Sequence, residues 1–518
     1  MIRRWSAPSL IDLIVDADSF SRWDEELTST DPLGFVDTRS YVSRLVTAAE
    51  ATDVTEAVLT GAARVGGRDV VVIAGAFEFL AGTQGLVAGE RVARAFDRAT
   101  HHRLAVVGLP TSGGTRMQEG SLAFVQMLKI AASIAAFRAA GGRYVAWLRH
   151  PTMGGVLASY GSLAHVTWAQ PGALVGLTGP RVIAEVDGTP LPEHVQRAEH
   201  LVRHGVVDDV VPADALRQRI GPALAALDGP AHGHGHEGGP WSRAWPAHPV
   251  PATLPPSGQR ADDPWAAVVR SRAAGRPGLP ALLDLAATDV VRLRGDGAGG
   301  RDDGCVTVVC RFRDRRVVVV GHDRPAGARG AAVGAVGYRA AHRAMRLADT
   351  LGLPLVTVVD TRGAASTSAA ESGGIAREIA TCMATMSTLR RPTVAVLLGE
   401  GSGGGAIAWL PADRVVAVEH AWLAPIAPEG ASAILYRTSE RAAELARTQA
   451  IDVWSLRAIG VVDQIVPEAA DWLAALADAV ADQLTALLAQ PTDTRLTARA
   501  QRLRSIGSLT TRARERAG

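Results

Sequence analysis

The sequence predicts an α/β protein in which one domain fold occurs twice in tandem. Two observations support this prediction. Segments of the first half recur in the same order in the second half. Within each half, short runs rich in β-branched residues are followed by glycine-containing turns and longer alanine-rich segments with helical periodicity. Alternating strands and helices of these lengths indicate a sheet of buried, nearly parallel strands.

The internal repeat rests on three matched pairs of segments. Their offsets lie between 250 and 255 residues: Pro110–Gly113 corresponds to Asp360–Gly363, Gly154-Gly155 to Gly404-Gly405, and His204–Pro212 to Ile459–Pro467. Chance readily produces one such match among apolar, glycine-rich peptides. Three matches in the same order indicate a duplicated fold.

The strands and the domain limits follow from this repeat. The predicted strands are Asp69–Ala74, Leu104–Leu109, Tyr144–Leu148, Arg316–Val320, Leu355–Val359 and Val394–Leu398. We expect an N-terminal domain over residues 1–228, a linker rich in Pro, Gly and His over 229–262, and a C-terminal domain over 263–518. We interpret the histidine run at 232–236 as solvated connector rather than metal site, because glycine-spaced histidines have no fixed geometry.

Composition excludes several classes of protein. Hydrophobic residues make up 47% and charged residues 20% of the chain, as in a soluble globular protein. A net charge of +2 gives no electrostatic reason to expect nucleic acid or an anionic membrane as a partner. The three cysteines contain no CxxC pair, so they form neither a disulfide framework nor a zinc ribbon, and we expect a cytoplasmic protein: Cys305, Cys310 and Cys382.

No segment is expected to enter a membrane or to direct secretion. The N-terminal segment lacks a long apolar core, since Asp12 interrupts it. The most apolar stretch, residues 124–140, is broken by Lys129 and Arg138 and is too short to span a bilayer.

Paired glycines follow the third predicted strand of each half, where a helix begins. They are Gly154-Gly155 and Gly404-Gly405. Glycine lets a ligand approach the backbone, and the first N–H groups of a helix are unpaired and carry positive potential. Two N–H groups aimed at one point stabilise an enolate or another oxyanion. The alternative is that these glycines only permit tight packing of strand and helix, but their occurrence at repeat-equivalent positions favours the chemical interpretation.

The turns after the second strands supply further candidates. Capping-box spacing between Thr115 and Gln118, and between Ser368 and Glu371, marks two helix starts. Arg116 could hold an anionic group, pair with Glu119, or pair with a neighbouring subunit. The candidate substrate-binding residues are Gly113, Gly114, Thr115, Arg116, Gly363 and Ala364.

These peptides resemble the carboxyltransferase of acetyl-CoA carboxylase, in the form that joins β-type and α-type subunits end to end. Residues 104–212 resemble the β-type half through LPTSGGTRMQEG, RHPTMGGVLASYG and GVVDDVV. Residues 355–467 resemble the α-type half through VVDTRGA, ESGGIAREIA, GEGSGGGAIA and GVVDQIV.

The resemblance implies a crotonase-like ββα-superhelix in each domain and an active site between the N-domain of one subunit and the C-domain of another. We therefore expect a homodimer or a higher homo-oligomer. Carboxybiotin and an acyl-CoA would enter from opposite sides, and the carboxyl group would move to the acyl α-carbon. One pair, Gly154-Gly155 or Gly404-Gly405, would serve the thioester enolate, and the other the biotin ureido oxygen. The family is thought to use biotin itself to take the α-proton, so no side-chain base is required.

Two departures from the family pattern stand out. β-type subunits often carry a four-cysteine zinc ribbon, which this chain lacks, so we expect no zinc and no other metal. The α-type half usually has a Pro-Gly stretch after its Asp-Thr, whereas this chain has Asp360-Thr-Arg-Gly-Ala-Ala-Ser-Thr-Ser. That change leaves the acyl substrate open.

The carboxyl donor must come from other proteins. Biotin is attached to a lysine, and the only lysine, Lys129, lies in an amphipathic helical setting, so this chain should carry no biotin. It also shows no P-loop. We expect a separate biotin carboxylase and biotin carboxyl carrier protein as partners. Lys129 either meets a CoA phosphate or reaches the surface, and we favour the surface.

Three rival functions are weighed against this one. An acyl-CoA hydratase, isomerase or hydrolase of the same fold would need acidic residues beside the oxyanion site, and Glu119, Glu371 and Glu400 are the candidates. The first two are interpreted as helix-start residues. A decarboxylase would use the same residues in reverse. A non-catalytic scaffold subunit is supported by the altered 361–368 stretch and opposed by the intact glycine pairs.

Overall fold

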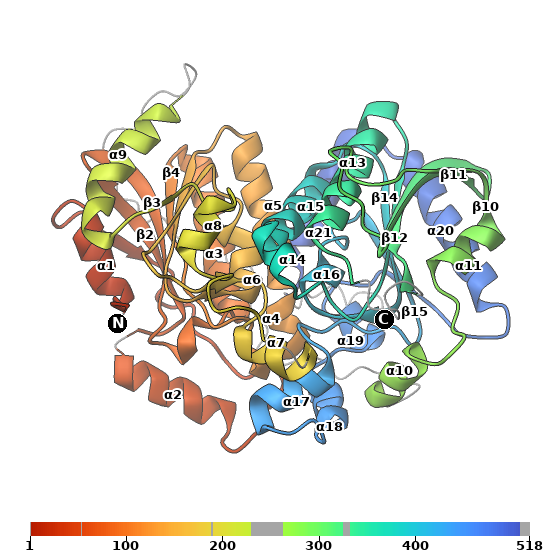
Figure 1. Cartoon of the computed structure of the whole chain (residues 1–518), viewed down its shortest axis with the longest axis horizontal. Coiled ribbons are helices and arrows are strands. Elements are labelled where there is room, and N and C mark those ends of the chain that lie inside the picture. The colour runs from red at the N-terminus through yellow and green to blue at the C-terminus, as the bar shows by residue number, and fades with distance from the viewer. Residues whose placement is uncertain (1, 53, 188–189, 229–262, 325–331, 508–518) are drawn as a thin grey trace, which may run out of the picture.

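The computed structural model describes residues 2–52, 54–187, 190–228, 263–324 and 332–507. Over these residues the chain forms two α/β domains, each built on a seven-stranded sheet. Figure 1 shows the first half in red to yellow beside the second half in green to blue. The predicted fold class, α/β with one fold used twice in tandem, is confirmed. The predicted linker over 229–262 lies outside the described residues, and the domain limits stay predictions.

The N-terminal sheet contains all three strands predicted for it. In spatial order its strands are β1 (Ser21–Trp23), β2 (Val58–Val65), β3 (Arg68–Gly75), β4 (Ala105–Leu109), β5 (Tyr144–Leu148), β7 (Val166–Ala169) and β9 (Asp209–Val210). The ladder is parallel from β3 to β9, whereas β1, β2 and β3 pair in antiparallel fashion. A two-residue turn joins β2 to β3, and its Gly66 and Gly67 have φ of 58° and 76°, the left-handed values that such turns require.

The C-terminal sheet repeats this plan. Its strands are β10 (Ala287–Arg292), β11 (Cys305–Phe312), β12 (Arg315–His322), β13 (Leu355–Thr361), β14 (Thr393–Gly401), β15 (Arg414–Val418) and β16 (Gln464–Val466), again antiparallel as far as β12 and parallel beyond. The prediction of nearly parallel strands therefore holds for the strands from β3 to β9 and from β12 to β16. The antiparallel strands at the opposite edge of each sheet, β1 and β2 in the first and β10 and β11 in the second, were not predicted.

Four long helices reveal the true register of the repeat. Helices α3 (Leu86–His102) and α13 (Ala335–Leu351) have 17 residues each, and α5 (Gln126–Ala139) and α15 (Ile375–Thr388) have 14 each. Both pairs begin 249 residues apart. The repeat therefore aligns at 249 in this region, one residue less than the predicted 250.

The structure also contains further α-helices and a small parallel sheet of two strands, β6 and β8. They are α1 (Ala7–Ile14), α2 (Tyr41–Thr52), α4 (Gly120–Phe124), β6 (Thr152–Met153), α6 (Gly154–Val156), β8 (Val175–Gly176), α7 (Pro180–Asp187), α8 (Ala198–Arg203), α9 (Leu216–Ala226), α10 (Pro264–Ser271), α11 (Leu279–Ala286), α14 (Ser368–Ser372), α16 (Gly403–Ile407), α17 (Pro428–Tyr436), α18 (Ala442–Thr448), α19 (Val453–Ala458), α20 (Trp472–Leu488) and α21 (Thr492–Ser505).

The two halves pack together through α5. Helix α15 of the second half and the C-terminal helix α21 both contact α5, and one hydrophobic core contains side chains from both halves. Figure 1 shows α5, α15 and α21 together where the halves meet. The segment Met117–Ala139 is long and apolar enough to cross a membrane by length and composition, but 89% of an apolar 18-residue window within it is buried inside the protein. Burial between two domains accounts for its apolar composition.

The structure corrects our expectation that Lys129 reaches the surface. Its side chain is 1% exposed, and Nζ lies 3.0 Å from the Glu90 carboxylate. Arg504, on α21, holds the same carboxylate through contacts of 2.7 and 2.8 Å. The periodicity of α5 suggested an exposed face, but α3, α15 and α21 cover the helix on several sides.

Candidate active site

A cavity of about 870 Å³ lies between the two halves. This volume is typical of sites for cofactors and other small molecules. Both halves contribute its wall. The lining includes most of the candidate residues: Gly113, Gly114, Thr115, Gly154, Gly155, Gly363, Ala364 and Gly404.

In the N-terminal half, two turns meet at this wall. After β4, the Ser112 hydroxyl accepts a hydrogen bond of 2.9 Å from the Gly114 N–H. At the end of β6, the Met153 N–H donates to the Ser112 carbonyl at 3.0 Å. Helix α6 then begins at Gly154, which has a φ of 61°. A Cβ on Gly154 would lie 3.2 Å from the Gly114 Cα, so glycine is needed for this close approach.

The C-terminal half builds the same backbone arrangement. The Thr361 hydroxyl accepts from the Gly363 N–H at 3.1 Å, as Ser112 does from Gly114. The Ser402 N–H donates to the Thr361 carbonyl at 3.1 Å. Helix α16 begins at Gly403, whose φ is 64°. Gly403 is therefore the counterpart of Gly154.

This register corrects one candidate residue. Gly404 corresponds to Gly155 and lines the cavity, but Gly405 does not. A Cβ on Gly405 would lie 2.7 Å from the Tyr338 hydroxyl and 2.8 Å from the Ala364 nitrogen, so this glycine faces the packed interior. The sequence-based pairing was one residue out of register because three consecutive glycines match a pair equally well. The equal lengths of the flanking helices would have given the correct register.

Each glycine pair supplies helix N-terminal amides to the cavity. Gly154 and Gly155 are the first two residues of α6, and Gly403 and Gly404 are the first two of α16. The N–H groups in the first turn of a helix have no partner one turn earlier. Each turn can therefore stabilise a negatively charged oxygen.

Both turns belong to one chain. We expected the N-domain of one subunit to meet the C-domain of another. In this structure Gly155 and Gly404 line the same cavity within a single polypeptide. The expectation that the site forms between two subunits stays a prediction. The halves are held together by contacts that sequence alone does not reveal. For example, the Ser121 hydroxyl donates to the Leu423 carbonyl at 2.7 Å.

Arg116 does not line the cavity, and its prediction as a substrate-binding residue is wrong. Its side chain is 0% exposed and forms ion pairs with Glu56 and Glu119, the second of them at 3.3 Å. Against the effect of burial, these carboxylates raise the pKa of Arg116 well above its usual value. The Tyr41 hydroxyl donates to Glu119 at 2.5 Å, and so does the Leu86 N–H. Arg116 therefore stabilises the turn from the side that faces the protein interior. Its pairing with Glu119 is one of the three alternatives that the sequence left open.

The two predicted capping boxes are absent from the described helices. Helix α4 starts at Gly120 without a side-chain cap from Thr115 or Gln118. Helix α14 is capped by Thr367, whose hydroxyl accepts from the Ala370 N–H at 3.2 Å. Glu371 turns instead toward the N-terminal half. Instead of capping its own helix, the Glu371 carboxylate accepts hydrogen bonds from residues of the other half.

Four charged side chains line the cavity: Arg44, Arg272, Arg362 and Glu429. Arg272 pairs with Glu400 and, at 2.5 Å, with Glu429. Arg362 lies 3.4 Å from Glu400, and its side chain is 76% exposed. In the 249-residue register, Arg362 stands where the N-terminal half has Gly113. The departure from the family pattern thus places a cation on the cavity wall.

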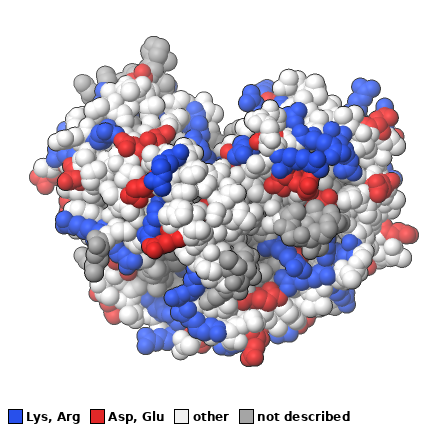
Figure 2. Space-filling model, in the orientation of Figure 1, with Lys and Arg blue, Asp and Glu red and all other residues white. Residues whose placement is uncertain are grey.

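Charge on the face shown in Figure 2 is mixed. Acidic and basic side chains lie over both halves, and basic side chains gather at the upper right of the view. Among the described residues, no group of three or more His, Cys, Asp or Glu side chains could hold a metal ion.

The carboxylates of the rival hydratase interpretation are engaged elsewhere. Glu119 is buried behind the turn, Glu371 is 5% exposed, and Glu400 pairs with Arg272 and Arg362. None of the three lines the cavity. Within the described part of the chain, no pair of free carboxylates faces the glycine turns, as an acid–base mechanism would require.

Comparison with known proteins identifies the two halves. Residues 11–229 match a family model described as carboxyl transferase domain. Residues 260–507 match one described as acetyl co-enzyme A carboxylase carboxyltransferase-like. The chain is thus a carboxyltransferase.

Full-length relatives make the assignment more specific. A Mycobacterium tuberculosis (strain ATCC 25618 / H37Rv) protein, described as a probable biotin-dependent acyl-coenzyme A carboxylase beta3 subunit, is 46% identical over 505 residues, which covers 95% of this chain and 97% of the relative. The acetyl-coenzyme A carboxylase carboxyl transferase subunits beta/alpha of Salinispora arenicola are 39% identical over 520 residues, with 98% and 91% covered. A solved structure of transcarboxylase 12S is 19% identical, with a TM-score of 0.37, and covers 94% of this chain and 90% of its own. The chain belongs to the carboxyltransferase subunits of biotin-dependent acyl-CoA carboxylases.

Proposed function

We propose that this carboxyltransferase moves the carboxyl group of carboxybiotin to the α-carbon of acetyl-CoA or another short acyl-CoA, giving malonyl-CoA or a homologue. One observation carries the proposal. Two glycine turns of the same backbone geometry, one from each half, open on one cavity. A transfer between two carbonyl-containing substrates needs one oxyanion site for each.

Each glycine turn stabilises one of the two reactants. One pair, Gly154-Gly155 or Gly403-Gly404, stabilises the thioester enolate, and the other stabilises the ureido oxygen of biotin. Arg44, Arg272 and Arg362 on the wall supply cationic groups for the phosphates of CoA. The described residues that line the cavity include no unpaired carboxylate, since Glu429 is held by Arg272, which agrees with a mechanism that needs no side-chain base.

The carboxyl donor is proposed to arrive on a separate biotin carboxyl carrier protein, loaded by a biotin carboxylase, in the cytoplasm. The burial of Lys129 supports this, because a biotin ligase cannot reach its amine in the folded protein. A homodimer or a larger homo-oligomer is part of the proposal.

The test is a carboxylation assay with the purified chain, a biotin carboxylase and carrier pair, ATP, bicarbonate and a panel of acyl-CoAs. We expect carboxylated acyl-CoA, with acetyl-CoA or another short acyl-CoA preferred. Failure with every acyl-CoA, in the presence of a partner shown to carboxylate its own biotin, would contradict the proposal. Decarboxylation of malonyl-CoA without net carboxylation would identify the protein as a decarboxylase. Inactivity in both directions would identify it as a non-catalytic scaffold subunit.

A further inference from the structure

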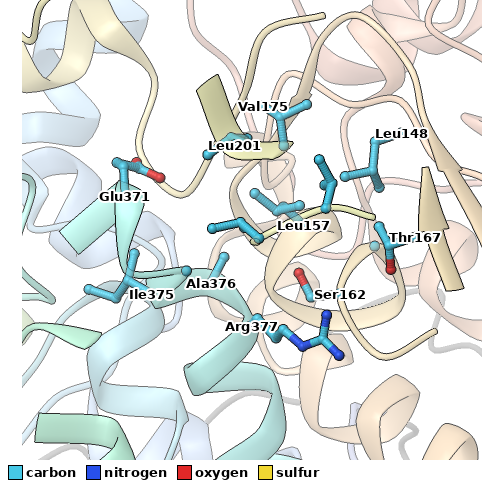
Figure 3. Close-up of a pocket in the computed structure, with 14 residues that line it drawn as sticks. Leu148, Leu157, Ser162, Thr167, Val175, Leu201, Glu371, Ile375, Ala376 and Arg377 are labelled. Carbon is cyan, nitrogen blue, oxygen red and sulfur yellow. The ribbon is translucent and has the colours of Figure 1, made fainter. Parts of the chain in front are cut away.

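Glu371 is a buried carboxylate that the proposed reaction does not use. It lies on α14 of the C-terminal half, and its side chain points across the boundary into the N-terminal half. Figure 3 shows it at one side of a small pocket between the halves, facing residues of the N-terminal half such as Val175 and Leu201. Its side chain is 5% exposed.

Its hydrogen-bond donors come from the N-terminal half. The Leu177 N–H lies 3.0 and 3.2 Å from its two carboxylate oxygens, and the Gln196 amide donates at 2.7 Å. Gly176 makes room for this contact, because a Cβ there would lie 2.2 Å from the Gln196 nitrogen. Glu371 therefore binds one particular segment of the opposite half.

That segment forms part of the active-site cavity. Leu177, Thr178 and Gly179 line it, and so do Val182 and Ile183 on the helix that follows, α7. The Leu177 side chain also reaches the second glycine turn, since its Cδ1 is 3.4 Å from the position of a Cβ on Gly404. Glu371 thus fixes the distance between a wall of the N-terminal half and the oxyanion turn of the C-terminal half.

The described residues provide no cation that pairs with this carboxylate. Burial raises the pKa of Glu371 to about 7, although its hydrogen bonds to Gln196, Leu177 and Thr178 oppose the shift. His200, on α8, is engaged with the Ser372 hydroxyl at 2.8 Å. Figure 3 shows Arg377 on the far side of the small pocket. The charged or titratable groups on the surrounding elements include Arg181 on α7, His200 on α8, Arg339 on α13 and Arg377 on α15.

We propose that Glu371 is a positioning residue for carboxyl transfer, whose ionised carboxylate holds the Leu177–Gly179 wall against the Gly404 turn. This inference rests on the proposed function. When the carboxyl is protonated, one acceptor oxygen becomes an O–H that faces N–H donors, and the wall is released. The cavity therefore has its working shape when Glu371 is charged.

Ionisation of Glu371 should lower the stability of the folded protein while it raises the activity. Because the pKa of Glu371 is raised in the folded state, the folded protein is penalised for the charge above pH 7, and the penalty disappears as the pH falls toward the ordinary value of 4.5. A neutral side chain of the same shape removes this penalty. A residue retained only for stability would not show this pattern.

The experiment compares Glu371→Gln with Glu378→Gln in the full chain. Glu378 is a suitable control, because it lies seven residues further along, on the following helix α15, is also partly buried, and pairs with Arg339 away from the cavity. We expect kcat/KM of Glu371→Gln to be about tenfold below that of the wild type at pH 8, and the two to converge at pH 6. Its melting temperature should exceed that of the wild type at pH 8, with a smaller difference at pH 5.

Hydrogen–deuterium exchange gives a readout that does not depend on activity. Amides of Leu177–Ile183 in the wild type should be more protected at pH 8 than at pH 6, after correction for intrinsic rates. In Glu371→Gln this difference should vanish, and in Glu378→Gln it should remain. Equal protection in all three proteins, or an unchanged pH profile for Glu371→Gln, would overturn the inference. A wild type that carboxylates no acyl-CoA would instead overturn the proposed function, whereas the exchange measurement would still test the contact.

Discussion

The two glycine turns have the same backbone and different surroundings. In both, a hydroxyl after the preceding strand accepts from a glycine N–H, and a glycine with φ near 60° begins the helix. The side chain nearest to a Cβ on Gly155 would be Met127, whereas a Cβ on Gly404 would lie nearest to Ile379 and Leu177. Duplication has preserved the backbone geometry of the turns, and the side chains around them have diverged. This combination suits the proposed function, in which one site holds two different carbonyl compounds.

Charge shows the same division. The arginine of the N-terminal turn, Arg116, is fully buried and engaged by Glu56 and Glu119. The arginine of the C-terminal turn, Arg362, stands on the cavity wall with most of its side chain exposed. The first arginine therefore serves the fold, and the second is available to a ligand.

The largest expected effect concerns stability. Arg116→Met leaves two buried carboxylates without their cation, and breaking a buried ion pair of this kind typically costs about 3–5 kcal/mol. Arg362→Ala removes an exposed pair, which contributes about 0–1 kcal/mol. Urea unfolding of the two variants measures the contrast. Equal midpoints would remove the distinction between the two arginines.

Removal of one amide from either turn should cause the next largest loss. Gly155→Pro and Gly404→Pro each delete one N–H within the first turn of a helix, where proline is tolerated. We expect turnover to fall about 100-fold or more in each case. Gly179→Ala is the control, because Gly179 lines the same cavity and a Cβ there meets no atom within 4 Å. Unchanged turnover in both proline variants would make the glycines purely structural.

Arg362→Ala should have an intermediate effect on binding. Loss of a charge-assisted hydrogen bond should raise the KM for acyl-CoA about tenfold, with kcat little changed. An acyl thioester of pantetheine, which lacks the phosphates, should show no such difference between variant and wild type. Arg362→Lys should recover part of the loss. A KM that changes only for the carrier protein would assign Arg362 to the carboxybiotin side instead.

The smallest expected effect depends on pH. Burial raises the pKa of Asp360 to about 6, so above that pH the folded state is penalised for its charge, and the penalty disappears as the pH falls toward 3.8. The counterpart in the N-terminal turn is the neutral Thr111. Asp360→Asn should therefore raise the melting temperature at pH 8 by about 1–3 °C, with a smaller gain at pH 5. A gain that is independent of pH would contradict this account.

Sequence predicted the repeated architecture well, because it depends on local patterns. The six strands were recognisable as short β-branched runs followed by glycine, and the structure contains all six. The turns at Gly113-Gly114 and Gly154-Gly155 also lie on the cavity, since a strand that ends and a helix that begins leave a local signature.

The errors concern tertiary contacts. Sequence does not show whether an arginine is buried or exposed. Arg116 was therefore predicted to bind the ligand, although it pairs with Glu56, which lies 60 residues away in the sequence. Glu371 matched a local capping motif, yet its acceptor oxygens serve Leu177, 194 residues earlier. Lys129 was misplaced for the same reason. In each case the deciding partner comes from an element that sequence spacing cannot locate.

The burial of the only lysine has a chemical consequence for an enzyme that works among thioesters. Acyl-CoAs slowly acylate accessible lysine amines, and such modification removes charge from protein surfaces. In this chain the other basic residues are arginine or histidine, and the single ε-amine is enclosed beside Glu90. Its cationic surface can therefore withstand prolonged exposure to its own reactants without losing charge through lysine acylation.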